Sequence, residues 1–155
     1  MAYNPTDNVA EILTRDLGII ADEVRATIDA QLWLAVPGVT NSVGTLALHI
    51  CGNLHHFIGS ILGHDGYLRD REAEFSLRDI PKVTLLEKIA ATQTAVMDAL
   101  DGFDPVNLQE PMPDTPPQHK GRTIGFFLIQ LCCHTSRHLG QMNYLRRILT
   151  SGAEA

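Results

Sequence analysis

The sequence has no lysine- or arginine-rich block, and its formal net charge is −6 over 155 residues with the seven histidines counted as neutral. Proteins that bind nucleic acid through its phosphates need clustered positive charge. The sequence therefore predicts no nucleic-acid partner. It also contains no glycine-rich phosphate loop and no nucleophile-and-base pair that can be placed from the pattern alone.

Long hydrophobic runs are absent as well. The most apolar stretch, residues 124–133, is about half as long as a segment that crosses a bilayer. The first seven residues lack the basic segment and apolar core of a signal peptide. Cysteine is scarce, and Cys51, Cys132 and Cys133 all fall in apolar helical stretches, so each is expected to be a reduced, buried side chain. We therefore expect a cytoplasmic protein without a membrane role.

The remaining composition, 45% hydrophobic and 19% charged, is typical of a globular protein, and we expect one domain over residues 1–155. Apolar residues recur with helical spacing in four segments, and no segment alternates as a strand does. The sequence thus predicts an all-α four-helix bundle. Two long connections, about residues 63–83 and 103–121, argue against a simple up-down-up-down topology. The helices are expected at about residues 6–34, 42–62, 84–102 and 122–150.

Capping residues mark the predicted helix ends. The first helix is expected to begin at Thr6 or Asp7, the second at Thr40, Asn41 or Ser42, and the last at Thr123. A capping box over residues 84–87 is expected to begin the third helix, while Gly63 and Gly102 end the second and third. Within the first connection, which we interpret as a solvated loop, Arg69, Arg71 and Glu74 are expected to form a local ion network.

Two histidines lie on the apolar face of the last predicted helix. His134 and His138 are four residues apart, so they share one face, and Gln141 follows on it. A buried imidazole without a partner costs about 1–3 kcal/mol. A divalent metal would use both ring nitrogens, because histidines at this spacing offer two convergent ligands. The alternative is a pair of core histidines satisfied by neighbouring backbone or side chains.

Other candidates lie on the first two helices. His49 stands at the border between a polar and an apolar face, where it could turn into the core. His56, near Asn53, is interpreted as lining a pocket or a polar subunit contact, and His55 is expected to be exposed. Asp16 and Glu23 lie close to the buried stripe of the first helix, where a carboxylate facing solvent is the favoured interpretation.

Two pieces of this sequence resemble the DinB-like family, which includes the YfiT-type metal-dependent proteins. One is the segment 45–50 with its single histidine, preceded by the break at Pro37-Gly38. The other is the pattern His134-x-x-x-His138-x-Gly140-Gln141. The resemblance implies a four-helix bundle, often a homodimer, in which His49, His134 and His138 hold a zinc or nickel ion. Some members are transferases that use low-molecular-weight thiols such as bacillithiol, mycothiol or glutathione.

Three neutral imidazoles leave coordination positions open, which is the pattern of catalytic rather than structural sites. The ion could lower the pKa of a bound water or hold a thiol as thiolate. Ligating histidines usually donate their second N–H to an acceptor. Gln141, Asn53 and Asp16 are the candidates for that role.

Three hypotheses follow from these residues. The first is a metal-dependent enzyme acting on a small molecule, either a transferase or, second, a hydrolase. The second is a non-catalytic binding or stress-response protein whose metal has a fourth protein ligand, such as His56, Cys133 or Glu23. The third is a metal-free structural dimer in which the histidines are fully hydrogen-bonded.

Overall fold

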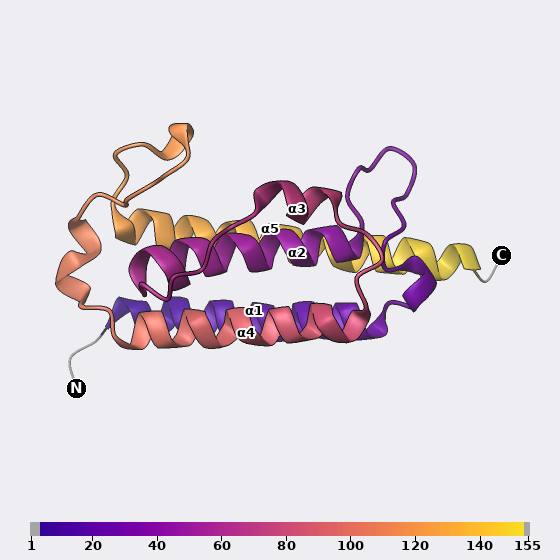
Figure 1. Cartoon of the computed structure of the whole chain (residues 1–155), viewed down its shortest axis with the longest axis horizontal. Helices are drawn as coiled ribbons and strands as arrows, with labels where there is room; N and C mark the ends of the chain where they lie inside the picture. Colours follow the sequence, from indigo (N-terminus) through magenta and orange to yellow (C-terminus); the bar gives the residue numbers. More distant parts are fainter. Residues whose placement is uncertain (1–3, 154–155) are drawn as a thin grey trace.

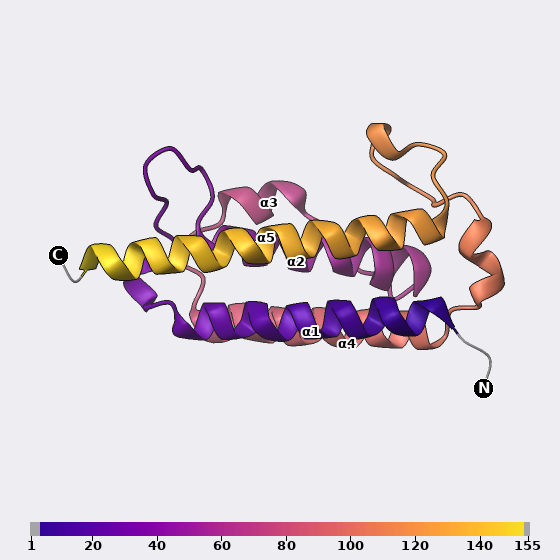
Figure 2. The ribbon, with the colours of Figure 1, turned by 180° about the vertical axis from the view of Figure 1, so that it is seen from behind.

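The computed structural model describes residues 4–153 and shows a helical bundle (Figure 1). Four long helical segments run side by side along its longest axis, and Figure 2 shows the same arrangement from behind. They confirm the all-α prediction. The segments are α1 (Pro5–Ala26), α2 (Val43–Leu54) with its continuation η2 (His55–Leu62), α4 (Lys82–Asp101) and α5 (Ile124–Ala153).

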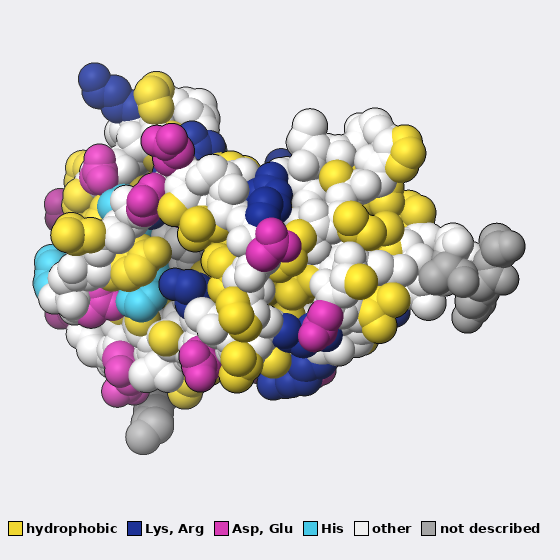
Figure 3. Space-filling view, turned by 45° about the vertical axis from the view of Figure 1, so that its right-hand side comes forward, with side chains coloured by type: hydrophobic (Ala, Val, Ile, Leu, Met, Phe, Trp, Pro, Cys, Tyr) yellow, Lys and Arg dark blue, Asp and Glu magenta, His cyan; other side chains and the backbone are white. Residues whose placement is uncertain are grey.

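The core lies between the apolar stripes of these helices. In α1 the predicted positions Leu13, Ile20 and Val24 are fully buried, while Val9 is only partly buried against them. Burying one such side chain stabilises the fold by about 1.5–3 kcal/mol. The stripe of α1 packs on α4 and α5, and α2 packs on α4 and α5 from the other side. Figure 3 shows one face of the molecule, where acidic, basic and apolar side chains are intermixed.

The prediction for the first helix is wrong at both ends. Asn4 caps α1 in place of Thr6 or Asp7, because its side chain accepts from the Thr6 N–H at 3.1 Å and Pro5 fills the first turn. The helix ends at Ala26 rather than near residue 34. Both the N–H and the hydroxyl of Thr27 bond to the Glu23 carbonyl, and Thr27 itself is extended. A short 3-10 turn, η1 (Asp29–Gln31), follows.

Ser42 caps α2 as predicted, since its side-chain oxygen accepts from the Thr45 N–H at 3.1 Å. From His55 onward the segment continues as a π-helix, which the periodicity did not predict, and it ends at Gly63 as expected. The capping box predicted for the third helix is wrong, because α4 begins two residues earlier, after Pro81. Thr123 caps α5 as predicted, accepting from the Phe126 N–H at 3.2 Å.

Both long connections contain structure. The interpretation of residues 63–83 as a loop is wrong in its middle, where α3 (Arg71–Ser76) forms with Asp70 as its cap and packs on α2. The second connection carries two short turns, η3 (Pro105–Gln109) and η4 (Pro117–His119). In Figure 1, α3 and the loop with η4 project on the side of the bundle that α2 and α5 form.

Candidate metal centre

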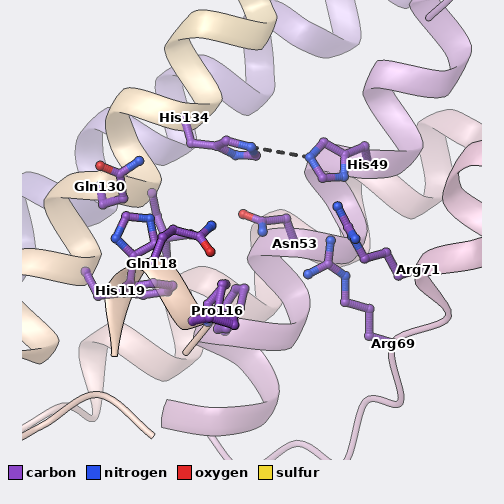
Figure 4. Close-up of a pocket in the computed structure, with 13 residues that line it drawn as sticks. His49, Asn53, Arg69, Arg71, Pro116, Gln118, His119, Gln130 and His134 are labelled. Carbon is purple, nitrogen blue, oxygen red and sulfur yellow. Dashed lines mark hydrogen bonds between the residues drawn. The ribbon is translucent and has the colours of Figure 1, made fainter. Parts of the chain in front are cut away.

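Three histidines from two helices meet at one point between α2 and α5. The Nε2 atom of His134 lies 3.3 Å from Nε2 of His49 and 3.1 Å from Nε2 of His138. One ring nitrogen from each histidine lies within 4.8 Å of the other two, an arrangement that could hold a metal ion. His49 is buried, and the two histidines of α5 are half-buried. Figure 4 shows His49 and His134 facing each other.

The spacing of these nitrogens suits a coordination sphere. A zinc ion binds imidazole nitrogen at about 2.0–2.1 Å, so two ligands at a tetrahedral angle lie about 3.3 Å apart. The two Nε2 distances, 3.3 Å and 3.1 Å, are close to that value. His134 therefore already stands about as far from each of the other two histidines as two ligands of one ion stand from each other.

Hydrogen bonds at the opposite ring nitrogens determine the tautomers of two histidines. Nδ1 of His49 lies 2.9 Å from Oε2 of Glu74, and Nδ1 of His138 lies 2.7 Å from Oε1 of Gln141. Burial would raise the pKa of Glu74, but hydrogen bonds from Arg69 and His49 outweigh it and lower that pKa. An ionised carboxylate and an amide oxygen only accept, so both Nδ1 atoms donate. The Nε2 atoms of His49 and His138 are thus left with lone pairs directed at His134.

His134 is the least satisfied of the three. Its Nδ1 atom is buried and has no hydrogen-bond partner. Burial, together with the charges of His138 and His49, lowers the pKa of His134 to about 4. Burial also lowers the pKa of His138, although its bond to Gln141 opposes the shift. Two Nε2 lone pairs therefore converge on the His134 ring, and imidazole nitrogen is a preferred ligand of divalent metals, so the donor set fits such an ion.

Glu74 is a functional residue that the sequence reasoning missed. It lies on α3 and accepts two further hydrogen bonds from Arg69, at 2.6 and 2.9 Å. The predicted ion network is therefore confirmed for Arg69 and Glu74, which extend it to a histidine, but it is wrong for Arg71, which forms no ion pair among the described residues. A Cβ atom at Gly52 would stand 2.0 Å from Oε1 of Glu74, so a glycine there lets this carboxylate approach α2. The signal in the sequence was the charged run near Glu74, but its link to His49 depends on how α3 packs.

A cavity of about 470 Å³ opens beside the histidines (Figure 4). His49 and His134 line it, and both long connections contribute residues to its wall. Arg69 and Arg71 come from the first connection, and residues 116–119 come from the second. The remaining lining residues come from the α2–η2 segment and α5, and they are Asn53, Phe57, Phe127, Gln130 and Leu131.

A known protein family matches most of this chain. A family model described as "Protein of unknown function (DUF1572)" matches residues 10–153. The chain belongs to the DUF1572 family. No curated protein matches the sequence. Among the described residues of this DUF1572 protein, no helix is both long enough and apolar enough to cross a membrane.

The three residues that the sequence suggested as hydrogen-bond acceptors for the histidines have different positions in the structure. Gln141 bonds to His138, and Asn53 lines the cavity with its Oδ1 atom buried and without a hydrogen-bond partner. Asp16 does not reach the histidines, which corrects its assignment. Its carboxylate accepts from the Ser136 hydroxyl and pairs with Arg15, on a different face of α5 from the histidines.

None of the residues considered as a fourth ligand joins the three histidines. His56 lies 3.3 Å from Asp114 and does not line the cavity. Glu23 is buried rather than solvent-facing and bonds to Asn143 and Arg146. Cys133 is exposed, which corrects the expectation of a buried thiol. Within residues 4–153, the group that could hold a metal ion therefore contains the three histidines alone.

One further histidine differs from expectation. His55 was expected to be exposed, but it is half-buried, bonds to Asp65 at 2.8 Å and stacks on Tyr67 with ring centroids 4.1 Å apart. Asp65 and Tyr67 follow the π-helix in the chain, so His55 is half-buried because the start of the first connection folds back over it.

Proposed function

We propose that this DUF1572 protein binds one divalent ion, zinc or nickel, through His49, His134 and His138, and acts as a metal-dependent enzyme on a small molecule. The observation that carries the proposal is the convergence of three Nε2 atoms beside a cavity, without a fourth protein ligand in the described chain. Catalytic sites keep such a position open for water or substrate, whereas structural sites close it.

The first candidate reaction is transfer to or from a low-molecular-weight thiol. The resemblance of the second and last helices to DinB-like proteins supports this class, as does the order of four long helices in the bundle. The ion would supply a positive charge that keeps a bound thiol in its thiolate form. The same resemblance supports a homodimer. Hydrolysis, with water at the open position, is the second candidate.

The chain's own residues would prepare the ligands. Glu74 holds the proton of His49 on Nδ1, and Gln141 holds that of His138. Both bonds fix the ring orientation and leave Nε2 free to bind the ion. The cavity walls would limit the size of the substrate and keep bulk water from surrounding it.

Two alternatives are less well supported. A metal that only staples the bundle needs a closed coordination sphere, but His56 and Glu23 bond to other residues and Cys133 is exposed and outside the three-histidine group. A metal-free structural cluster needs fully hydrogen-bonded imidazoles, but His134 Nδ1 has no partner. Both observations favour an open metal site.

Elemental analysis of untagged protein purified without chelators tests the metal site. We expect about one equivalent of zinc or nickel in the unmodified protein and loss of tight binding in His138→Ala, because two imidazoles hold a divalent ion far more weakly than three. His56→Ala is the matched control and should keep the full equivalent. A full equivalent in His138→Ala would contradict the three-histidine site.

Metal-loaded protein can then distinguish the two reactions. Incubation with an electrophilic acceptor and each of bacillithiol, mycothiol and glutathione should give a thiol adduct detectable by mass spectrometry. Thiol-independent hydrolysis of ester or amide substrates would favour the hydrolase instead.

A further inference from the structure

The cavity beside the histidines carries positive charge in a molecule whose net charge is −6. Its described lining includes two guanidinium groups, those of Arg69 and Arg71, and no carboxylate. Figure 4 shows both arginine side chains extending toward His49 and Asn53. A cavity with this lining attracts an anion, because one sign of charge in a recess focuses the local potential.

The two arginines differ in how far their charges are already compensated. Arg69 donates two hydrogen bonds to Glu74, so a carboxylate neutralises it. Arg71 has no ion pair among the described residues, and its described contact is with the ring of Phe75, 5.6 Å from its guanidinium carbon. Arg71 is therefore the guanidinium that remains available to a ligand.

A second, independent polar group lies in the same cavity. Oδ1 of Asn53 is buried and has no hydrogen-bond partner. Leaving such an acceptor unpaired costs about 1–3 kcal/mol. A hydrogen-bond donor on a bound molecule would pair with this oxygen and remove that cost. Asn53 follows His49 by one helical turn on α2, and both residues line the cavity.

We infer that the substrate of this site is a small anion, with a carboxylate or phosphate group that Arg71 binds and an N–H or O–H group that Asn53 Oδ1 accepts. A guanidinium matches both anions because its planar donors can form two parallel hydrogen bonds. Arg69 contributes less, since Glu74 already occupies its donors. The reacting atom of the same molecule lies at the open metal position, and this part of the inference rests on the proposed function.

Nuclear magnetic resonance on ¹⁵N-labelled protein tests the anion site directly. Sodium acetate and inorganic phosphate are titrated separately, at constant ionic strength kept with chloride, into zinc-loaded and metal-free protein. We expect a saturable shift of the Arg71 Nε–H resonance in both forms, because Arg71 is the group that binds the anion. If acetate binds more tightly, the anionic group of the substrate is a carboxylate. If phosphate binds more tightly, that group is a phosphate monoester.

Arg71→Gln should weaken the binding at least roughly tenfold, because it removes a charge-assisted bidentate contact. Arg147→Gln is the matched control, since Arg147 also lies over an aromatic ring, that of Tyr144, but outside the cavity. Arg71→Lys should keep part of the affinity, and backbone amide spectra verify the fold of each variant. No saturable shift in the unmodified protein, or equal weakening in Arg147→Gln, would overturn the inference.

Zinc content, measured on the same samples, separates this inference from the proposed function. One equivalent of zinc without an anion-dependent shift leaves the metal site standing and rejects the anion site. Anion-dependent shifts in a protein that takes up no zinc reject the metal-dependent enzyme and keep the anion site.

Discussion

The position of the proton on each imidazole ring determines which nitrogen of that histidine can bind a metal ion. Glu74 and Gln141 each hold a proton on Nδ1 of a neighbouring ring, which directs two Nε2 lone pairs at His134. Without these acceptors, each ring could turn over or carry its proton on the metal-facing nitrogen. Glu74 is also tied to Arg69, so the orientation of His49 depends on a charge pair in the first connection.

Glu74→Gln tests this positioning role. The amide keeps the size of the side chain but loses the negative charge that favours Nδ1–H on His49, so zinc affinity should fall about 10- to 100-fold. Competition with a chromophoric chelator measures the affinity. Glu72→Gln, an exposed change on the same short helix, is the control and should leave it unchanged. Equal affinity in the two variants would mean that Glu74 does not support the ligand.

Between elements, a buried ion pair joins the first and last helices. Glu23 on α1 accepts from Arg146 and Asn143 on α5. Burial would raise the pKa of Glu23, but the hydrogen bonds from Arg146 and Asn143 outweigh it and lower that pKa below its ordinary value of 4.5. The pair therefore stabilises the packing of α1 on α5 at neutral pH, at a distance from the histidines.

The lowered pKa gives a signed pH dependence. The folded state holds the Glu23 proton less tightly than the unfolded chain, so this stabilisation is complete above about pH 4.5 and is lost as the pH falls through the lower, folded value. Glu23→Gln should reduce the free energy of unfolding by about 1–3 kcal/mol at pH 7 and flatten its decline below pH 4.5. Urea unfolding across pH measures both effects.

Glu87→Gln, an exposed change on α4, is the control for this experiment and should stay within about 0.5 kcal/mol of the unmodified protein. If Glu23→Gln behaved in the same way at every pH, the ion pair would contribute nothing to the bundle.

Over the whole molecule, the histidine cluster joins α2 to α5, and α3 joins the cluster through Glu74. An ion bound there crosslinks segments that are 85 residues apart in the chain. Metal binding is therefore coupled to the stability of the bundle, since the unfolded chain does not hold the three rings together.

Thermal unfolding measures this coupling. Free zinc at about a hundred times its dissociation constant adds about 2.7 kcal/mol of stability. For a chain of this size, that corresponds to an increase in Tm of roughly 5–10 °C. His138→Ala should show little of the increase. An equal zinc-dependent increase in both proteins would mean that the ion binds elsewhere.

The sequence determined what depends on neighbours along the chain. Periodicity of 3.6 residues predicted an all-helical protein, and the spacing of His134 and His138 placed both on one face of one helix. Ser42, Gly63 and Thr123 marked helix ends because capping uses backbone groups only a few residues away. These features need no knowledge of which helix packs on which.

The tertiary structure decided what depends on contacts between segments. Glu74 reaches His49 across 25 residues only because α3 packs on α2 over Gly52, and Asp16 bonds to Ser136 across 120 residues because α1 packs on α5. The partner of a buried carboxylate is the donor that packing brings to it. The spacing of residues along the chain does not specify that donor, since contacts between helices depend on how all the apolar faces of the bundle pack together.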